Sequence, residues 1–198
     1  MNGTFFDIGL GLGLATACGL RPYLPALLAG ALGSSAALHV SFTGHYHFLQ
    51  SGWWLLAVTV VLALTYLAQL RMGAERFDAA ASGMIAAQGL AVGALLFAGT
   101  LSAHGEVSWP GLPAGAAAAA LARAAVGPVI GGARSRLSDR AAREALTMYL
   151  DAASLALAGL VALLHPLGYL APLLMGWLLL RVRARAGAKY AGLRIMRR

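Results

Sequence analysis

The amino-acid sequence predicts an all-α membrane protein, a polytopic helix bundle of about six hydrophobic segments. Three observations indicate this class. Hydrophobic residues make up 60% of the 198 residues, the mean hydropathy is +0.74, and only 11% of the residues are charged, whereas soluble domains carry about 25% charged residues. Several apolar stretches are long enough to cross a bilayer as helices. The many Ala and Gly residues suit close helix packing in lipid.

Six hydrophobic segments follow one another along the chain. They span Phe5–Leu38, Trp53–Leu70, Ala79–Leu101, Leu112–Ile130, Leu146–Leu164 and Leu167–Leu180. We therefore expect one membrane domain over residues 1–180 and a basic cytoplasmic tail over residues 181–198. Both halves of the chain contain three segments and open with one that Gly and Pro interrupt, which suggests a weak inverted repeat.

The first segment holds an arginine, Arg21, in an apolar stretch that is too long for one straight span. As a helix, residues 8–38 would be about 46 Å long at about 1.5 Å per residue, whereas the hydrocarbon core is about 30 Å thick. Pro22 and Pro25 each lack the N–H that a continuing helix needs, and Gly19 eases a bend. We therefore expect a broken first helix, with the break near Gly19–Pro22 and a second half-helix that begins near Pro22.

The later segments are more regular. The second, third and fifth segments have ordinary spanning lengths. The fourth is rich in Ala, and its Arg123 either extends toward the cytoplasm or joins a polar interior. The sixth is short, and it continues into the arginine-bearing turn that follows it.

Basic residues alternate between the loops. The loops before the third and fifth segments and the tail hold two, four and seven Lys and Arg residues, and the loops at residues 39–52 and 102–111 hold none. By the positive-inside rule, the basic loops and the tail are cytoplasmic, and six crossings place both termini there. The tail is expected to bind anionic lipids of the bilayer. Because the basic residues cluster beside apolar spans, nucleic acid is not an expected partner; a homo-oligomer is compatible with these features.

Burying a charged side chain inside a membrane costs so much free energy that such a residue indicates a functional site and a partner group. Asp78 and Asp151 are the candidate partners of Arg21. The positive end of the second half-helix beside the Arg21 guanidinium would form an anion site. The candidate substrate-binding residues are therefore Arg21, Pro22, Gly19, Asp151, Asp78 and Arg123. The alternative is a structural ion pair, in which Arg21 ties the first segment to the third or fifth segment without any ligand.

Metal binding and catalysis receive less support from the sequence. His45, His47, His104 and Glu106 lie in the two loops without basic residues and could bind a metal, but an interfacial belt with the neighbouring tryptophans explains them better. No cofactor is expected. No HExxH motif, no Ser/His pair on facing spans and no Cys beside a base is present, so we do not expect an enzyme.

Three stretches resemble a known family. They are "CGLRPYLPALLAGAL", the "ERFDAAASGM" turn and "ALTMYLDAASLALAGLVALLHPLGYL", and together they resemble the bacterial integral-membrane family catalogued as domain of unknown function 4126. The resemblance extends over most of the chain. It implies a small multi-span protein of the bacterial cytoplasmic (inner) membrane and brings no activity with it. The turn holds two acidic residues, Glu75 and Asp78, which is fewer than is typical of that family.

Two functions from different classes follow from these residues. The first is a transporter, channel or flippase-like protein for a small anion or an anionic lipid headgroup, in which Asp151 and Asp78 act as gating or proton-coupling carboxylates. The second is a structural or assembly membrane protein, in which the same charges only pack helices together. A transporter predicts that Arg21→Lys loses function while the fold survives. A structural ion pair predicts that Arg21→Ala fails to fold and is partly rescued when its partner aspartate is also removed.

Overall fold

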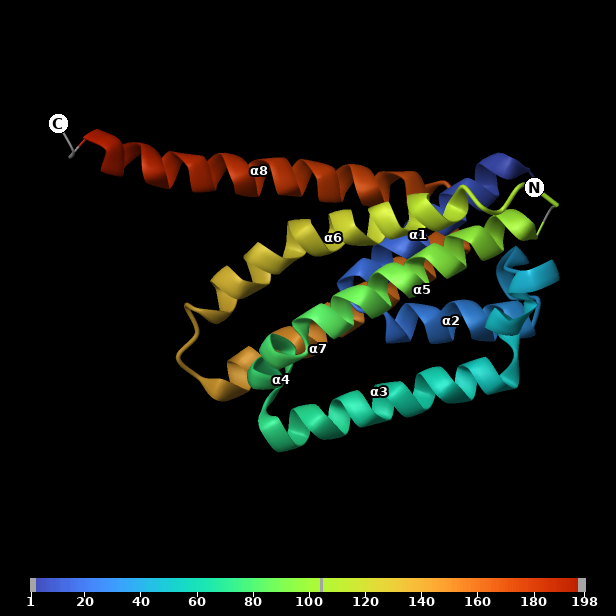
Figure 1. Ribbon diagram of the computed structural model, residues 1–198, viewed down its shortest axis with the longest axis horizontal. Coiled ribbons are helices and arrows are strands. Elements are labelled where there is room, and N and C mark those ends of the chain that lie inside the picture. Colours follow the sequence, from blue (N-terminus) through green and yellow to red (C-terminus); the bar gives the residue numbers. More distant parts are fainter. Residues whose placement is uncertain (1–2, 104, 196–198) are drawn as a thin grey trace.

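A computed structural model describes residues 3–103 and 105–195. Over these residues the regular structure is helical and contains no strand, which confirms the predicted all-α class. Within the described ranges, five helices are long and apolar enough to cross a membrane. They are α3 (Gly52–Met72), α5 (Ser82–Ser102), α6 (Gly111–Arg134), α7 (Arg140–Leu163) and α8 (Leu167–Ile195). The chain is thus a multi-pass membrane protein whose long helices run along one axis (Figure 1).

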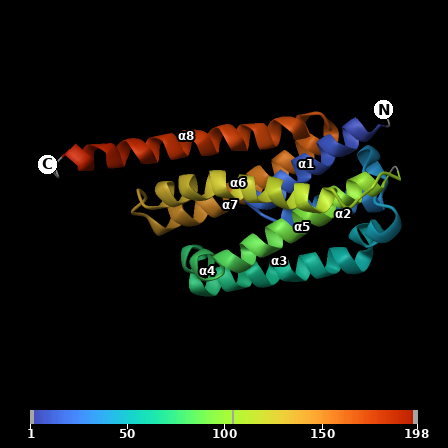
Figure 2. The same ribbon diagram turned by 45° about the horizontal axis from the view of Figure 1, so that its top comes forward.

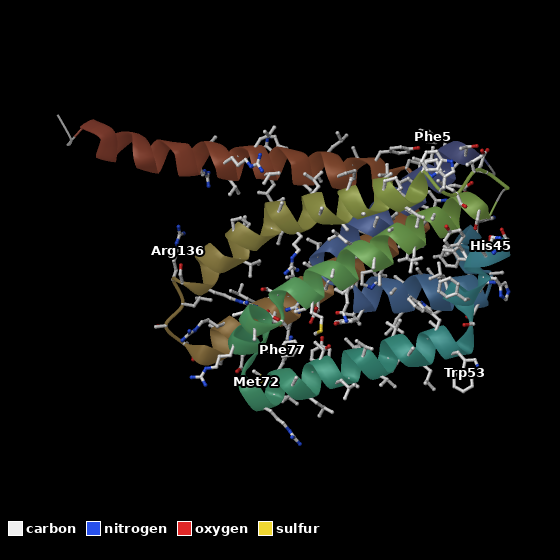
Figure 3. All side chains as sticks on the ribbon, viewed as in Figure 1. Phe5, His45, Trp53, Met72, Phe77 and Arg136 are labelled. Atoms are coloured by element: carbon white, nitrogen blue, oxygen red, sulfur yellow. The ribbon has the colours of Figure 1, made fainter. Side chains whose placement is uncertain are left out.

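Shorter elements complete the bundle. They are α1 (Thr4–Leu20), α2 (Tyr23–Ser34), the 3₁₀ turns η1 (Ala37–His39) and η2 (Gly44–Gln50), and α4 (Ala74–Ala80). The two ends of the bundle differ in composition. Figure 3 shows Phe5, His45 and Trp53 at one end, here called the N-terminal end. Met72, Phe77 and Arg136 lie at the other end, here called the basic end.

The helices α1 and α2 form a hairpin that enters and leaves the bundle at the N-terminal end. Helix α1 stops at Leu20 because Arg21 has an extended backbone, with φ −151° and ψ 122°. Pro22 then precedes α2, where its missing N–H leaves no helical hydrogen bond unmade. At the start of the hairpin, Thr4 donates a hydrogen bond to Glu106 (2.7 Å). Near its end, α2 packs on η2, since a Cβ added at Gly30 would meet the carbonyl oxygen of Leu49.

The sequence predicts that residues 5–38 form one of six crossings and that both termini lie on one side of the membrane. In the structure, the N-terminal residues lie at one end of the bundle and the C-terminal end of α8 lies at the other (Figures 1 and 2). The extended Arg21 turns the chain back before it reaches the basic end, so the five long helices that follow leave the two termini on opposite sides.

Small residues hold α1 against α5 and α6. A Cβ added at Gly19 would overlap the backbone of Ala119 on α6, and one added at Gly89 of α5 would meet the carbonyl oxygen of Cys18 at 2.9 Å. A Cβ at Gly93 would lie 3.3 Å from the carbonyl oxygen of Ala15. We call these contacts the small-residue seam. The seam packs α1 closely against α5 and α6 between the N-terminal end and Arg21.

One further element differs from the sequence-based expectation, and another agrees with it. Helix α6 continues through Pro128 to Arg134, whereas α1 and α2 are separate helices. The two halves of the chain therefore differ at the interrupted element on which the inverted repeat rested. Helix α8 runs as one helix across residue 180, as the expected continuation of the sixth segment into the arginine-bearing turn implies.

The outermost helices expose apolar side chains. Trp53 and Leu70 on α3 are 83% and 79% exposed, and Leu180 on α8 is 69% exposed. In a soluble domain such a surface would promote aggregation. In a bilayer it faces lipid tails, so α3 and α8 form part of the lipid-facing surface.

Candidate functional site

Arg21 lies where α1 ends, and its side chain is 6% exposed. Its Nη1 and Nη2 donate hydrogen bonds to the two carboxylate oxygens of Asp78 on α4, at 3.4 and 3.1 Å. Its Nε lies 3.3 Å from Oδ1 of Asp151 on α7, an ion-pair contact without hydrogen-bond geometry. Both aspartates proposed from the sequence therefore contact Arg21, so this arginine joins the hairpin to α4 and α7.

Asp78 is the acceptor for several donors at once. Besides the two bonds from Arg21, it accepts one from Nη2 of Arg134 at 2.7 Å and a longer one from Nε2 of Gln69 at 3.4 Å. Its carboxylate accepts from Arg21 after α1 and from side chains of α3 and α6, so it holds the short α4 against the bundle.

Asp151 has a different set of partners. The hydroxyl of Tyr66 on α3 donates to its Oδ2 at 2.7 Å, and Arg21 faces its other oxygen. A buried carboxylate needs such partners because its desolvation is costly. Asp151 thus ties α7 to α3 as well as to the hairpin.

Two further arginines, Arg123 and Arg134, come from one face of α6. Arg134 donates from Nη2 to Asp78 and also to the hydroxyl of Thr147, both at 2.7 Å. Arg123 donates from Nη2 to the carbonyl oxygen of Ser82 at 2.7 Å. Within residues 3–103 and 105–195, no carboxylate lies within ion-pair distance of Arg123. This arginine therefore keeps most of its donors for another group.

These side chains surround a cavity of about 300 Å³. Its charged lining consists of Arg21, Arg123, Arg134 and Asp78. Its apolar lining consists of Leu20, Ile85, Val126, Ile130 and Leu150, and three glycines complete it: Gly19, Gly127 and Gly131. Because three guanidinium groups and one carboxylate line the cavity, it favours an anion.

A model of the family described as domain of unknown function (DUF4126) matches residues 8–185. The chain belongs to this family. The match confirms the resemblance that the three sequence stretches indicate. No curated protein and no solved structure matches the chain.

The structure of this DUF4126 chain places the remaining sequence candidates as follows. Gly19 lines the cavity and belongs to the small-residue seam. A glycine is needed at this position because of the close packing on Ala119, not because the helix bends there. Pro22 is fully buried before α2 and does not line the cavity. Next to it, Tyr23 donates to Oε1 of Gln88 at 2.5 Å, which is the helix cross-link that a mid-span glutamine predicts.

The sequence analysis missed Arg134, which it assigned only to a basic loop. A signal was present, because Arg123, Gly127, Gly131 and Arg134 recur at helical spacing. Extending the fourth segment by one turn would have brought both arginines onto one face. Gln69, Tyr66 and Thr147 carry no such signal, since single polar residues in apolar helices are common.

The histidines of this DUF4126 chain do not form a metal centre in the part that the structure describes. No group of three His, Cys, Asp or Glu side chains there could hold a metal ion. His104, one of the four metal candidates, lies outside the described residues. Of the other candidates, His45 lies at the N-terminal end (Figure 3), His47 shares the turn η2 with it, and Glu106 accepts a hydrogen bond from Thr4. None of these three lines the cavity.

Proposed function

We propose that this DUF4126 protein is a transporter, channel or flippase-like protein for a small anion or an anionic lipid headgroup. The observation that supports this proposal is the charge of the cavity, which three arginines and one aspartate line. Placing an excess of positive charge among apolar helices is unfavourable unless an anion offsets it. A protein that only packs helices has no need of an open volume at this position.

The arginines have different roles in this proposal. Arg21 is engaged by two carboxylates and forms the back of the site. Arg123 and Arg134 contact the anion, because both line the cavity and neither is engaged by two carboxylates. Asp78 and Asp151 act as the gating or proton-coupling carboxylates, since each can release Arg21 when its own charge or position changes.

The basic end of the bundle is the cytoplasmic end in this proposal. The positive-inside rule places the loops around Met72 and Arg136 in the cytoplasm of a bacterial inner membrane. The cavity then lies on the cytoplasmic side of the small-residue seam. The basic tail binds anionic lipids of the same leaflet. Transport requires α1 to separate from α5 and α6 at the seam.

A structural or assembly role is the second candidate, and one observation favours it. Arg21 already has two carboxylates, so its charge needs no ligand. In this case the cavity is only a packing defect beside a buried ion-pair network. The two candidates differ in what happens when the cavity is filled without touching the network.

Two neighbouring glycines of α6 allow such a test. A Cβ at either Gly131 or Gly132 meets no atom within 4 Å, but only Gly131 lines the cavity. Gly131→Leu therefore fills the cavity, and Gly132→Leu is its matched control. We would reconstitute both variants and the wild type in liposomes and measure the flux of labelled phosphate, sulfate and chloride and the scrambling of labelled phosphatidic acid.

The transport proposal predicts flux or scrambling by the wild type and by Gly132→Leu, with a loss of about tenfold or more in Gly131→Leu. A structural role predicts that all three behave like empty liposomes. Equal activity of the two variants would also contradict a role for the cavity. Circular dichroism and thermal unfolding in detergent show whether both variants are folded.

A further inference from the structure

We propose that the cavity binds a phosphate group carrying two negative charges, held between Arg123 and Arg134 of α6. This inference rests on the proposed anion site and names the ligand class that the site takes. Four features of the cavity bear on it: the spacing of the two arginines, their unused donors, the charge of the network around it and the apolar part of its lining.

Arg123 and Arg134 lie about 16 Å apart along α6 at about 1.5 Å per residue, so their long side chains must converge to contact one phosphate group. Arg123 and Arg134 are eleven positions apart, which is close to three helical turns, so both lie on one face of α6. Gly127 and Gly131 lie between them on that face, and a Cβ at either position would meet nothing within 4 Å. The face therefore has a guanidinium at each end and open space between them.

The unused donors favour an oxyanion with several oxygens. A guanidinium carries five N–H donors. Arg123 uses only Nη2, for the carbonyl of Ser82. Arg134 uses only Nη2, for Asp78 and Thr147, and its buried Nε has no hydrogen-bond partner among the described residues. A tetrahedral phosphate offers more oxygen acceptors to these donors than a carboxylate does, and chloride offers a single centre.

The charge of the network favours an anion. Three guanidinium groups and one carboxylate line the cavity, and Asp151 pairs with Arg21 from outside the lining, so the network keeps an excess of one positive charge. A phosphate monoester carries about −1.5 to −2 charge at pH 7, and inorganic phosphate is similar. An uncharged ligand would leave the excess uncompensated in an apolar surrounding, which is unfavourable.

The apolar part of the lining allows two sources of the phosphate group. Leucine and isoleucine side chains of α1, α5, α6 and α7 share the cavity with the arginines. They could contact the glycerol and first methylenes of a phosphatidic-acid headgroup, or simply exclude water around free phosphate. The shared chemistry is the phosphate dianion, and the two sources are separated by experiment.

We would measure binding to the purified full-length protein in mild detergent by isothermal titration calorimetry. The probes are inorganic phosphate, dioctanoyl phosphatidic acid, sulfate, acetate and dioctanoyl phosphatidylcholine, whose phosphate is a monoanionic diester. The variants are Gly131→Leu, its control Gly132→Leu, and Arg123→Gln. The last is included because Arg123 has no carboxylate partner that the substitution would leave unpaired, so the fold should tolerate it.

We expect wild type and Gly132→Leu to bind phosphate, phosphatidic acid or both. Gly131→Leu and Arg123→Gln should bind about tenfold more weakly or worse, as expected when a charge-assisted contact is lost. Binding of both probes identifies the phosphate group itself as the determinant, and binding of phosphatidic acid alone identifies the lipid headgroup. Either result supports the proposal.

Preference for acetate, phosphatidylcholine or sulfate over both phosphate probes would overturn it, as would binding that the two α6 variants leave unchanged or the absence of binding. These results are separable from the liposome assay. Chloride or sulfate flux without phosphate binding would reject the ligand class and keep transport. Phosphate binding without any flux or scrambling would keep the ligand class and reject transport.

Discussion

Arg21 contacts two carboxylates, but these carboxylates differ in what else holds them. Asp78 also accepts hydrogen bonds from Arg134 and Gln69. Asp151 has only Tyr66 besides Arg21 in the described part of the chain. The two ion pairs of Arg21 are therefore not equivalent, and removing Arg21 leaves Asp151 with fewer partners than Asp78.

We predict that Arg21→Met lowers the free energy of unfolding by about 3–5 kcal/mol, because it leaves a buried carboxylate unpaired. Adding Asp151→Asn should recover more of this loss than adding Asp78→Asn, since Asp78 keeps Arg134. Reversible unfolding in mixed micelles gives the free energy of unfolding of the wild type, of Arg21→Met and of the two double variants. Equal recovery by the two second substitutions would show that the carboxylates are held alike.

A second prediction concerns Asp78 as a competitor for the ligand. Its carboxylate lines the cavity and occupies donors of Arg21 and Arg134. Asp78→Asn should therefore raise the affinity for phosphate by about tenfold, by removing a repelling charge. Asp151→Asn is the control, because Asp151 does not line the cavity, and we expect little change there. A lower affinity in Asp78→Asn would instead mean that the carboxylate positions the arginines.

At this scale the sequence predicted part of the site. Arg21, Asp78 and Asp151 were identified because charges in apolar segments are rare and must find partners. Which aspartate pairs with which arginine depends on how α4 folds against α6, and no local pattern encodes that. Arg134 was missed because its charge, read alone, is explained by topology.

At the scale of elements, glycines decide where helices can meet. Gly168 of α8 lies against the backbone of Gly9 on α1, so a Cβ there would overlap the Gly9 carbonyl. Gly176, further along α8, has no atom within 4 Å of a Cβ. One helix therefore holds a glycine that packing requires and one that packing does not.

We predict that Gly168→Ala destabilises the protein by about 1–3 kcal/mol, because the added methyl group forces α8 away from α1. Gly176→Ala should be neutral or stabilising by up to about 1 kcal/mol, since alanine favours a helix interior. Thermal unfolding in detergent compares the two variants. Similar losses in both would indicate that α8 does not pack on α1 through this contact.

The elements themselves were largely predictable, and their ends were not. The long apolar helices follow from length and hydropathy. We did not expect α6 to continue through Pro128. It does so because tertiary contacts on both sides of a proline can outweigh the one backbone hydrogen bond that the proline removes. The direction of α2 depends on the backbone angles of Arg21, which the sequence does not specify.

At the scale of the whole molecule, the α1–α2 hairpin determines the sidedness of the chain. Residues near Thr4 lie beside the loop that contains Val107, and Ser138 lies in the loop between α6 and α7 at the other end. Five helices that are long and apolar enough to cross a membrane follow this hairpin, whose two helices are shorter. The N-terminal residues and residue 107 are therefore expected on the same side of the membrane.

Single cysteines test this arrangement in cells. The native Cys18 is completely buried and should not react. Thr4→Cys and Val107→Cys should both react with an impermeant maleimide added from outside, and Ser138→Cys should react only after the membrane is opened. Labelling of Thr4→Cys together with Ser138→Cys would instead restore six crossings and contradict the hairpin.

The short hairpin also has a consequence for the order in which the protein is assembled. At about 1.5 Å per residue, α1 and α2 are about 26 and 18 Å long, shorter than the hydrocarbon core of about 30 Å. Helix α2 is too short to span the core and α1 is at the lower limit of about 17 residues, so we expect α3 to be the first segment that inserts as a stable span. We therefore expect the N-terminal hairpin to be made first and to reach its place after α5, α6 and α7 have formed the surface that receives it.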